Sequence, residues 1–110
     1  MNSNRPFGLS DGELQLVLQI LRAHVPGRPV YVFGSRATGK SRRLSDIDLA
    51  VGGSEPLDLL QRALLNEDFA ESDLPMSVDV LDLNAITPEF RQRISRDFVS
   101  LQVSEQGVAA

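Results

Sequence analysis

Apolar residues recur at helical spacing soon after the start of the chain. The members of this stripe, at i, i+3, i+4 and i+7, are Leu14, Val17, Leu18 and Leu21. Ser10 and Glu13 precede the stripe and form a capping-box pattern, in which each side chain accepts a hydrogen bond from a backbone N–H at the helix start. Pro26-Gly27 is typical of a helix end. The pattern therefore predicts an amphipathic helix between Ser10 and Pro26.

Short runs of β-branched and aromatic residues follow, each bounded by glycine, proline or polar residues. Such runs predict buried strands. The three predicted strands are 30–33, 47–51 and 76–83. Residues 98–103 fit either a short edge strand or a helix.

Two more helices are predicted from helix-start signals. The first is expected to start at Pro56 and to turn four apolar side chains toward the core. These are Leu57, Leu60, Leu64 and Phe69. The second has Thr87 as N-cap and Pro88 at its first position, and Phe90 and Ile94 would form its buried side.

The mixture of helices and strands predicts an α/β fold. A length of 110 residues is that of one domain, which can bury its own core. We expect a flexible arm at 1–9, a folded domain at 10–103 and a flexible tail at 104–110.

Composition excludes several classes of function. The chain has no cysteine, which excludes disulfide scaffolds, thiol catalysis and zinc–cysteine sites. Its single histidine, His24, lies in the last turn of the first predicted helix, and we interpret it as a surface or partly packed residue. No apolar run is long enough to span a membrane, and the N-terminus lacks the apolar stretch of a signal peptide. We expect a cytoplasmic protein without a membrane partner.

The charge of the chain favours some binding partners and disfavours others. With 15 acidic and 11 basic residues the chain carries a net charge of −4, which disfavours direct binding to nucleic acid. The basic cluster consists of Arg36, Lys40, Arg42 and Arg43. It directly precedes Asp46 and Asp48, and this neighbourhood favours a small anion with a metal ion over a duplex. The alternative is a set of solvated side chains that only balance the carboxylates.

One motif in this region is misleading. Residues 34–41 fit the phosphate-binding pattern G-x-x-x-x-G-K-[ST] after a predicted strand. That motif requires a helix after Lys40-Ser41, whose N–H groups hold the phosphates. Only residues 42–45 separate Ser41 from Asp46, and four residues cannot form such a helix. We therefore reject a P-loop.

The acidic residues suggest a metal site. Asp46 and Asp48 alternate along a strand and so point to the same face, where they repel each other unless a cation lies between them. Asp79 lies inside an apolar run on the third predicted strand and also calls for a cation. Oxygen ligands of this kind suit Mg²⁺. The alternatives are a solvated strand end for Asp46 and Asp48, and a satisfied core acid for Asp79. Asp82 faces the other side of its strand and is interpreted as structural.

A phosphate loop completes the pattern. Gly34 ends the first predicted strand, where the missing side chain lets backbone N–H groups approach a phosphate. Ser35 adds a hydroxyl at the start of a short helical turn. Gly-Ser alone is a common turn. In combination with the three acids it is the machinery for nucleotidyl transfer with two metal ions.

The sequence resembles the minimal nucleotidyltransferase (MNT) domain of the DNA polymerase β superfamily. The segments that carry the resemblance are 33–39, 45–51 and 78–83, with Gly-Ser, ten residues and Asp-x-Asp as the most specific spacing. The resemblance implies a mixed sheet of three to four strands flanked by helices, with ATP as substrate and two Mg²⁺ ions. It implies that Asp46 and Asp48 bind both metal ions, that Asp79 binds one, and that Gly34, Ser35 and Arg36 bind nucleotide.

Small members of this family are typically antitoxins paired with a HEPN-domain toxin. The resemblance therefore implies transfer of AMP from ATP to a hydroxyl of such a toxin, with a tyrosine as the acceptor. One alternative is an antitoxin that neutralises its toxin by binding alone. Another is a transferase that acts on a small hydroxyl compound, although no residues remain here for a second domain to hold that acceptor.

Overall fold

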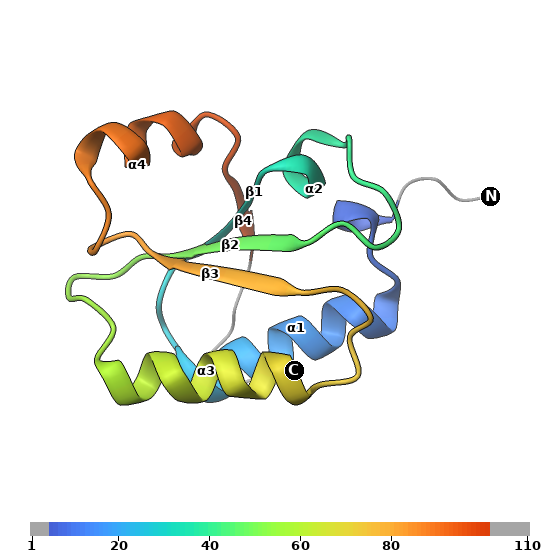
Figure 1. Cartoon of the computed structure of the whole chain (residues 1–110), viewed down its shortest axis with the longest axis horizontal. Helices are drawn as coiled ribbons and strands as arrows, with labels where there is room; N and C mark the ends of the chain where they lie inside the picture. The colour runs from blue at the N-terminus through green and yellow to red at the C-terminus, as the bar shows by residue number, and fades with distance from the viewer. Residues whose placement is uncertain (1–4, 102–110) are drawn as a thin grey trace.

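Four strands form one mixed sheet at the centre of the molecule (Figure 1). The computed structural model describes residues 5–101, so the expected tail at 104–110 and residues 1–4 of the expected arm lie outside the described residues. The strands are β1 Val30–Phe33, β2 Ile47–Val51, β3 Val78–Asp82 and β4 Val99–Leu101. Their order is β3-β2-β1-β4, with β2 parallel to β3 and β1 antiparallel to β2 and β4. The expected α/β class with a mixed sheet is confirmed.

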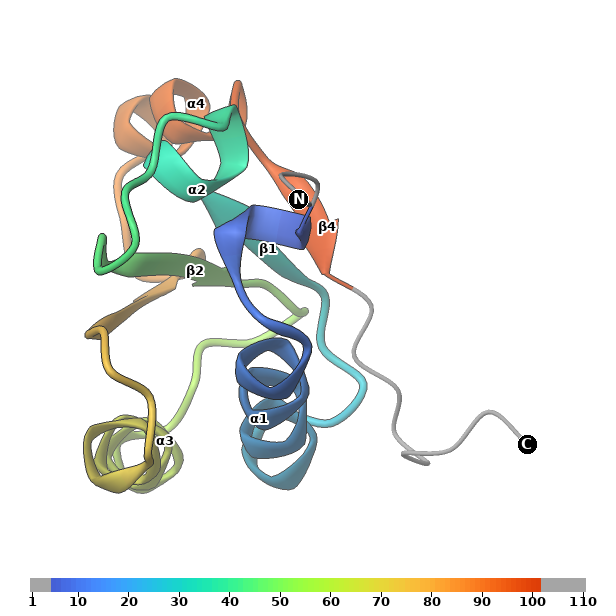
Figure 2. The ribbon, with the colours of Figure 1, turned by 90° about the vertical axis from the view of Figure 1, so that its right-hand side faces the viewer.

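Helices cover both faces of the sheet (Figure 2). The long helices α1 Asp11–His24 and α3 Leu59–Glu71 pack on one face. The short helices α2 Ser35–Thr38 and α4 Pro88–Ser95 lie on the other. The hydrophobic core lies between the sheet and the long helices, and its fully buried members include Val17, Leu21, Val32, Leu49 and Leu65. Within residues 5–101, one face of the sheet is therefore covered by two long helices, and the other face carries two short ones.

Helix α1 forms where local signals predict it. The Ser10 hydroxyl accepts a hydrogen bond from the Glu13 N–H at 3.1 Å, and the Glu13 carboxylate accepts one from the Ser10 N–H at 2.9 Å. Val17 and Leu21 are buried, while Leu14 and Leu18 pack against the core from its border. The predicted capping box and apolar stripe are both confirmed.

Helix α3 starts later than predicted and turns a different side toward the core. Its N-cap is Asp58, which accepts a hydrogen bond from the Gln61 N–H at 2.7 Å, so Pro56 and Leu57 precede the helix. Leu65 and Phe69 are buried, but Leu60 is 68% and Leu64 43% exposed. The prediction that Leu60 and Leu64 face the core is wrong because the buried stripe of α3 contains Leu65 and Phe69, four residues apart, and Leu60 and Leu64 lie on a neighbouring face of the helix. Leu57 and Phe69 are buried as expected.

The last two elements lie over the less covered face and at the sheet edge. Thr87 caps α4 by accepting from the Phe90 N–H at 3.1 Å, as predicted. Phe90 and Ile94 are only half-buried, because among residues 5–101 α4 packs little against the other helices and strands. Residues 99–101 form the edge strand β4 beside β1, so the strand alternative for this region is confirmed within the described residues.

The start of the described chain is tied to the domain. A short 3₁₀ helix, η1 Pro6–Gly8, leads to Leu9, which is 2% exposed and belongs to the core. The segment that we expected to be an arm therefore contributes a core residue.

Candidate active site

Two aspartates face each other across the parallel strands β2 and β3. Asp48 is in register with Asp79, and on its other side Asp48 is in register with Phe33 of β1. Ile47 and Leu49 are buried on the core face, so the alternation of side chains places Asp48 on the opposite face. Paired residues in neighbouring strands share a face, which places Asp79 beside Asp48. The pair lies on the face that carries α2 and α4.

Asp46 joins this pair from the residue before β2. It is two positions ahead of Asp48 and is exposed. Burial raises the pKa of the Asp48 carboxyl, and the negative charges of Asp79 and then Asp46 raise it further. The three carboxylates are therefore close enough to repel one another. We name them the carboxylate row.

The carboxylate row supplies oxygen ligands of the kind that a divalent cation requires. Within residues 5–101, no three aspartate, glutamate, histidine or cysteine side chains are gathered as closely as the ligands of one metal ion. Repulsion favours rotamers that keep carboxylate oxygens apart. The backbone register nevertheless brings the side chains to one face, and their chemistry fits Mg²⁺.

Gly34 holds the loop after β1 against this row. Its backbone has φ +75° and ψ −153°, a conformation that is essentially confined to glycine. A Cβ at this position would overlap the Asp48 Oδ2 atom and would lie 3.3 Å from its Cγ atom. Only glycine lets this loop lie so close to the carboxylate.

The loop continues into α2 with unsatisfied donors at its start. The first hydrogen bonds of α2 run from the Ala37 and Thr38 N–H groups to the Gly34 carbonyl oxygen. The N–H groups of Ser35 and Arg36 precede these bonds and have no partner within the helix. Both groups follow Gly34 directly and lie at the border of the carboxylate row.

No P-loop is present in this region. Helix α2 ends at Thr38, and Gly39 terminates it with a left-handed backbone at φ +82°. Residues 40–46 contain no helix that could follow Lys40-Ser41. The rejection of the P-loop from the sequence is confirmed.

The Arg36 side chain is buried, and its guanidinium donors are taken up by backbone carbonyl groups. It is 2% exposed, and its guanidinium donates to five carbonyl oxygens. The acceptors are those of Phe7, Gly8, Arg42, Arg43 and Ser45, at 2.7–3.4 Å. Burial lowers the pKa of Arg36, while the charges of Glu13 and Asp46 oppose that change. Its side chain holds the segment before Asp46, so the group of Arg36 that is left to bind nucleotide is its backbone N–H, and the predicted role of Arg36 stays a prediction.

Two other polar residues have the structural roles expected of them. Asp82 is 2% exposed and accepts hydrogen bonds from the Leu57 N–H at 2.8 Å and the Asn84 N–H at 2.9 Å. His24 is half-buried, with its Nε2 atom 2.9 Å from Asp68 Oδ2. Within the basic cluster, Arg43 pairs with Glu13 at 2.6 Å.

Sequence reasoning missed an aromatic group on the same sheet face. Tyr31 and Phe98 stack with ring centroids 4.7 Å apart, and Phe98 lies 6.1 Å from Phe33. Phe33 is the register neighbour of Asp48, so these rings form an apolar surface beside the carboxylate row. The alternation of Val30 and Val32 with Tyr31 and Phe33 was the available signal, since it assigns the rings to the less covered face.

Comparison with known families identifies this arrangement. The family described as polymerase beta nucleotidyltransferase matches residues 16–104, which contain the Gly-Ser loop and all three carboxylates. The chain belongs to the polymerase β nucleotidyltransferase family. The resemblance noted in the sequence is therefore confirmed.

Relatives within the nucleotidyltransferase family are protein adenylyltransferases. The chain is 43% identical over 108 residues to the probable protein adenylyltransferase MntA of Haemophilus influenzae, a match that covers 98% of this chain and 95% of the relative. A crystal structure of a toxin–antitoxin with AMP-PNP has a TM-score of 0.68 at 31% identity, over 84% of this chain and 75% of that one.

A further similar structure contains an AMPylated toxin. It is described as a tri-AMPylated Shewanella oneidensis HEPN toxin in complex with an MNT antitoxin, with a TM-score of 0.60 at 28% identity. The match covers 84% of this chain and 75% of that one. Among the helices that the structure describes in this nucleotidyltransferase, none has the length and apolar character to cross a membrane.

Proposed function

We propose that this nucleotidyltransferase transfers AMP from ATP to a hydroxyl of a HEPN-domain toxin and thereby acts as its antitoxin. The observation that carries the proposal is the register of Asp48 with Asp79 beside Gly34. This geometry brings the Gly34 loop and the first N–H groups of α2 next to a set of oxygen ligands. The names of the relatives support the choice of AMP and of a protein acceptor.

Each residue has a distinct task in this proposal. Asp46 and Asp48 would hold two Mg²⁺ ions, and Asp79 would hold one of them on the side of the acceptor hydroxyl. Bound Mg²⁺ neutralises phosphate charge and polarises the reacting oxygens. The backbone N–H groups of Ser35 and Arg36 and the Ser35 hydroxyl would bind the triphosphate, while Gly34 keeps that loop against Asp48.

The transfer is a substitution at the α-phosphorus of ATP. A bond forms from the acceptor oxygen to that phosphorus, the bond to the bridging oxygen breaks, and pyrophosphate leaves as the hydroxyl releases its proton. We propose a tyrosine hydroxyl as the acceptor, following the family resemblance. ATP is an intracellular substrate, and we place the reaction in the cytoplasm for that reason.

Intact mass spectrometry tests the proposal. The chain is incubated with its cognate HEPN-domain protein, ATP and Mg²⁺, and we expect the partner to gain the mass of one or more AMP groups. EDTA and the variant Asp46→Asn should each abolish the gain, because both remove the metal site. A partner that is neutralised without any gain in mass would assign the chain as a binding-only antitoxin. Full transfer by D46N would contradict the assignment of the carboxylate row.

A further inference from the structure

Strand β3 is an edge of the sheet, and half of its backbone groups point away from β2. The sheet pairs β3 on one side only within the described residues. The Ile47 N–H donates to the Ser77 carbonyl oxygen and the Leu83 N–H to that of Val51. In a parallel ladder with these hydrogen bonds, the N–H and C=O groups of Val78 and Val80 point outward, away from β2.

This outer edge is closed at one end and open at the other. The Val80 carbonyl oxygen accepts a hydrogen bond from Arg62 of α3 at 3.4 Å, and that of Asp82 accepts one from the Ala85 N–H at 2.9 Å. Both groups of Val78 and the N–H of Val80 remain on the open part. An edge of this kind is a template for another strand.

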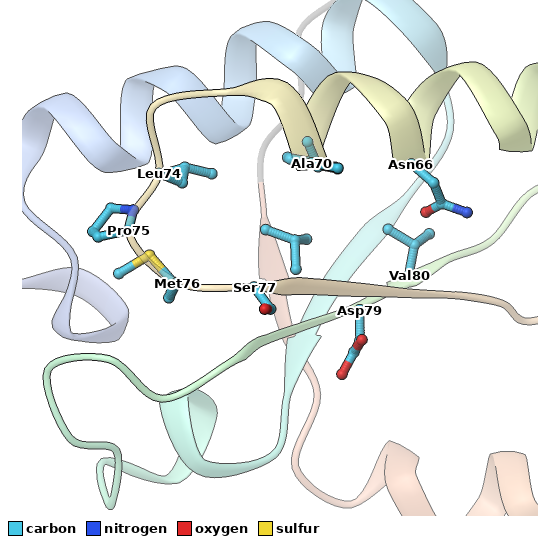
Figure 3. Close-up of a pocket in the computed structure, with 10 residues that line it drawn as sticks. Asn66, Ala70, Leu74, Pro75, Met76, Ser77, Asp79 and Val80 are labelled. Atoms are coloured by element: carbon cyan, nitrogen blue, oxygen red, sulfur yellow. The ribbon is translucent and has the colours of Figure 1, made fainter.

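A groove runs along the open part of the edge (Figure 3). Its volume is about 620 Å³, and its walls come from α3, the segment before β3 and β3 itself. Its lining is mixed: Ala70, Leu74 and Val80 are apolar, and Asn66 and Ser77 are polar. In Figure 3 the Asp79 carboxylate lies on the other side of β3 from Ala70 and Asn66. The groove therefore adjoins the carboxylate row through Asp79.

We propose that β3 and this groove bind an extended segment of the protein acceptor as an added strand. The inference rests on the proposed function and names how that acceptor docks. Side chains alternate along a strand, so the residue opposite Asp79 would share its face and direct a hydroxyl toward the carboxylate row. The neighbours on each side of that residue would point into the groove, toward Ala70 and Leu74.

The open edge of β3 and the neighbouring carboxylate row both favour an extended segment of the acceptor as the occupant of the groove. An added strand takes affinity from main-chain hydrogen bonds and specificity from pockets for alternate side chains, and β3 offers both. Among residues 5–101, the short helices α2 and α4 lie on the face of the carboxylate row (Figure 2), and Asp79 is exposed at the edge itself. An acceptor that docks at β3 reaches the carboxylates without any movement of the sheet.

Filling the groove tests the inference through kinetics. Ala70→Trp would fill it, and Ala63→Trp is the matched control, because Ala63 is an exposed residue of the same helix outside the groove. We expect A70W to raise KM for the HEPN-domain protein by about tenfold or more with little change in kcat, since it removes binding common to ground and transition states. Affinity for AMP-PNP should stay constant, and A63W should match the native chain. An unchanged KM in A70W would overturn the inference.

Hydrogen exchange tests the backbone pairing without turnover. We expect the amides of Val78 and Val80 to exchange more slowly in the complex with the HEPN-domain protein than in the free chain. Val78→Pro should weaken binding, because it removes an outward N–H at a strand start that tolerates proline. Val78→Ala keeps the N–H and should weaken binding less than Val78→Pro does. Complex formation with both amides at their free exchange rates would overturn the inference, as would protection that arises from pairing of two copies of this chain.

The two proposals fail in different ways. Protected amides without AMP transfer would retain the docking surface and reject the proposed function. AMP transfer with unprotected amides and an unaffected A70W would retain the function and reject the docking surface.

Discussion

Two charged regions flank the start of β2 and are built in opposite ways. At Arg36, a nearly inaccessible cation is surrounded by five carbonyl oxygens that satisfy its donors. At the carboxylate row, Asp48 is half-buried beside two further acids, and its pKa is raised. A buried charge with its hydrogen bonds complete stabilises a fold, whereas like charges held together oppose it. The first arrangement is structural, and the second indicates a cation-binding function.

The comparison also shows how the regions depend on each other. Arg36 holds the Ser45 carbonyl at 2.7 Å, and Asp46 is the next residue. The position of the first carboxylate therefore follows from the structural cation. Substitutions in the two regions should accordingly have effects of opposite sign on stability.

The largest effect is expected at Arg36. Arg36→Ala should lower the free energy of unfolding by about 3 kcal/mol or more, because several carbonyl groups lose their donors in a buried setting. The free energy of unfolding of Arg36→Lys should lie between those of R36A and the native chain, since lysine keeps the charge but loses the planar arrangement of donors. Urea denaturation measures both. The control is Lys40→Ala in the same loop, an exposed site that should change stability by no more than about 0.5 kcal/mol. A similar loss in R36A and K40A would contradict the role of Arg36.

A smaller loss of stability with a large loss of activity is expected at Gly34. Gly34→Ala should cost about 1–3 kcal/mol through backbone strain. It should also reduce AMP transfer about a hundredfold, because the new Cβ displaces the Asp48 carboxylate. Gly39→Ala separates the two effects: Gly39 also has a positive φ, but a Cβ there meets nothing within 4 Å. We expect G39A to lose stability and keep activity, and equal activities of G34A and G39A would refute the contact with Asp48.

The smallest effect, and the opposite sign, is expected at Asp48. The raised pKa means that the folded state holds the Asp48 proton more tightly than the unfolded state does. The protonated Asp48 carboxyl therefore contributes fully to stability below the ordinary pKa of an aspartate, about 3.9. This contribution is lost as the pH rises through the raised pKa of the folded state. Asp48→Asn cannot ionise and should melt at a higher temperature than the native chain at pH 8 in metal-free buffer.

The pH dependence provides the check on this last expectation. The difference in melting temperature between D48N and the native chain should shrink from pH 8 to pH 4, as the pH falls through the raised pKa of Asp48 toward the ordinary aspartate value. A variant that melts lower than the native chain at pH 8 would show that Asp48 is not destabilised by its neighbours. D48N should transfer no AMP at either pH.

Local signals in the sequence are sufficient to predict most of the helices and strands. The capping box at Ser10 and the N-cap at Thr87 depend on residues only three positions away, so the sequence contains all that their geometry requires. The strand at Ile47–Val51 is likewise predicted from its own residues. Helix α3 was placed wrongly because Pro56 and Asp58 are both acceptable helix starts. The contact of Asp82 with the Leu57 N–H, 25 residues apart, keeps Leu57 outside the helix.

For the candidate site, the identity and spacing of the proposed residues can be read from the chain alone. The spacing of Gly34, Ser35, Asp46, Asp48 and Asp79 is a linear property that reflects the alternation of side chains and the length of one loop. The tertiary structure decided what these residues meet. The register of β2 with β3 pairs Asp48 with Asp79, and the fold directs Arg36 to carbonyl groups of Phe7 and Gly8. The exposed edge of β3 also exists only in the assembled sheet. Contacts between distant segments depend on how strands pair and helices pack, and no local pattern of residues encodes them.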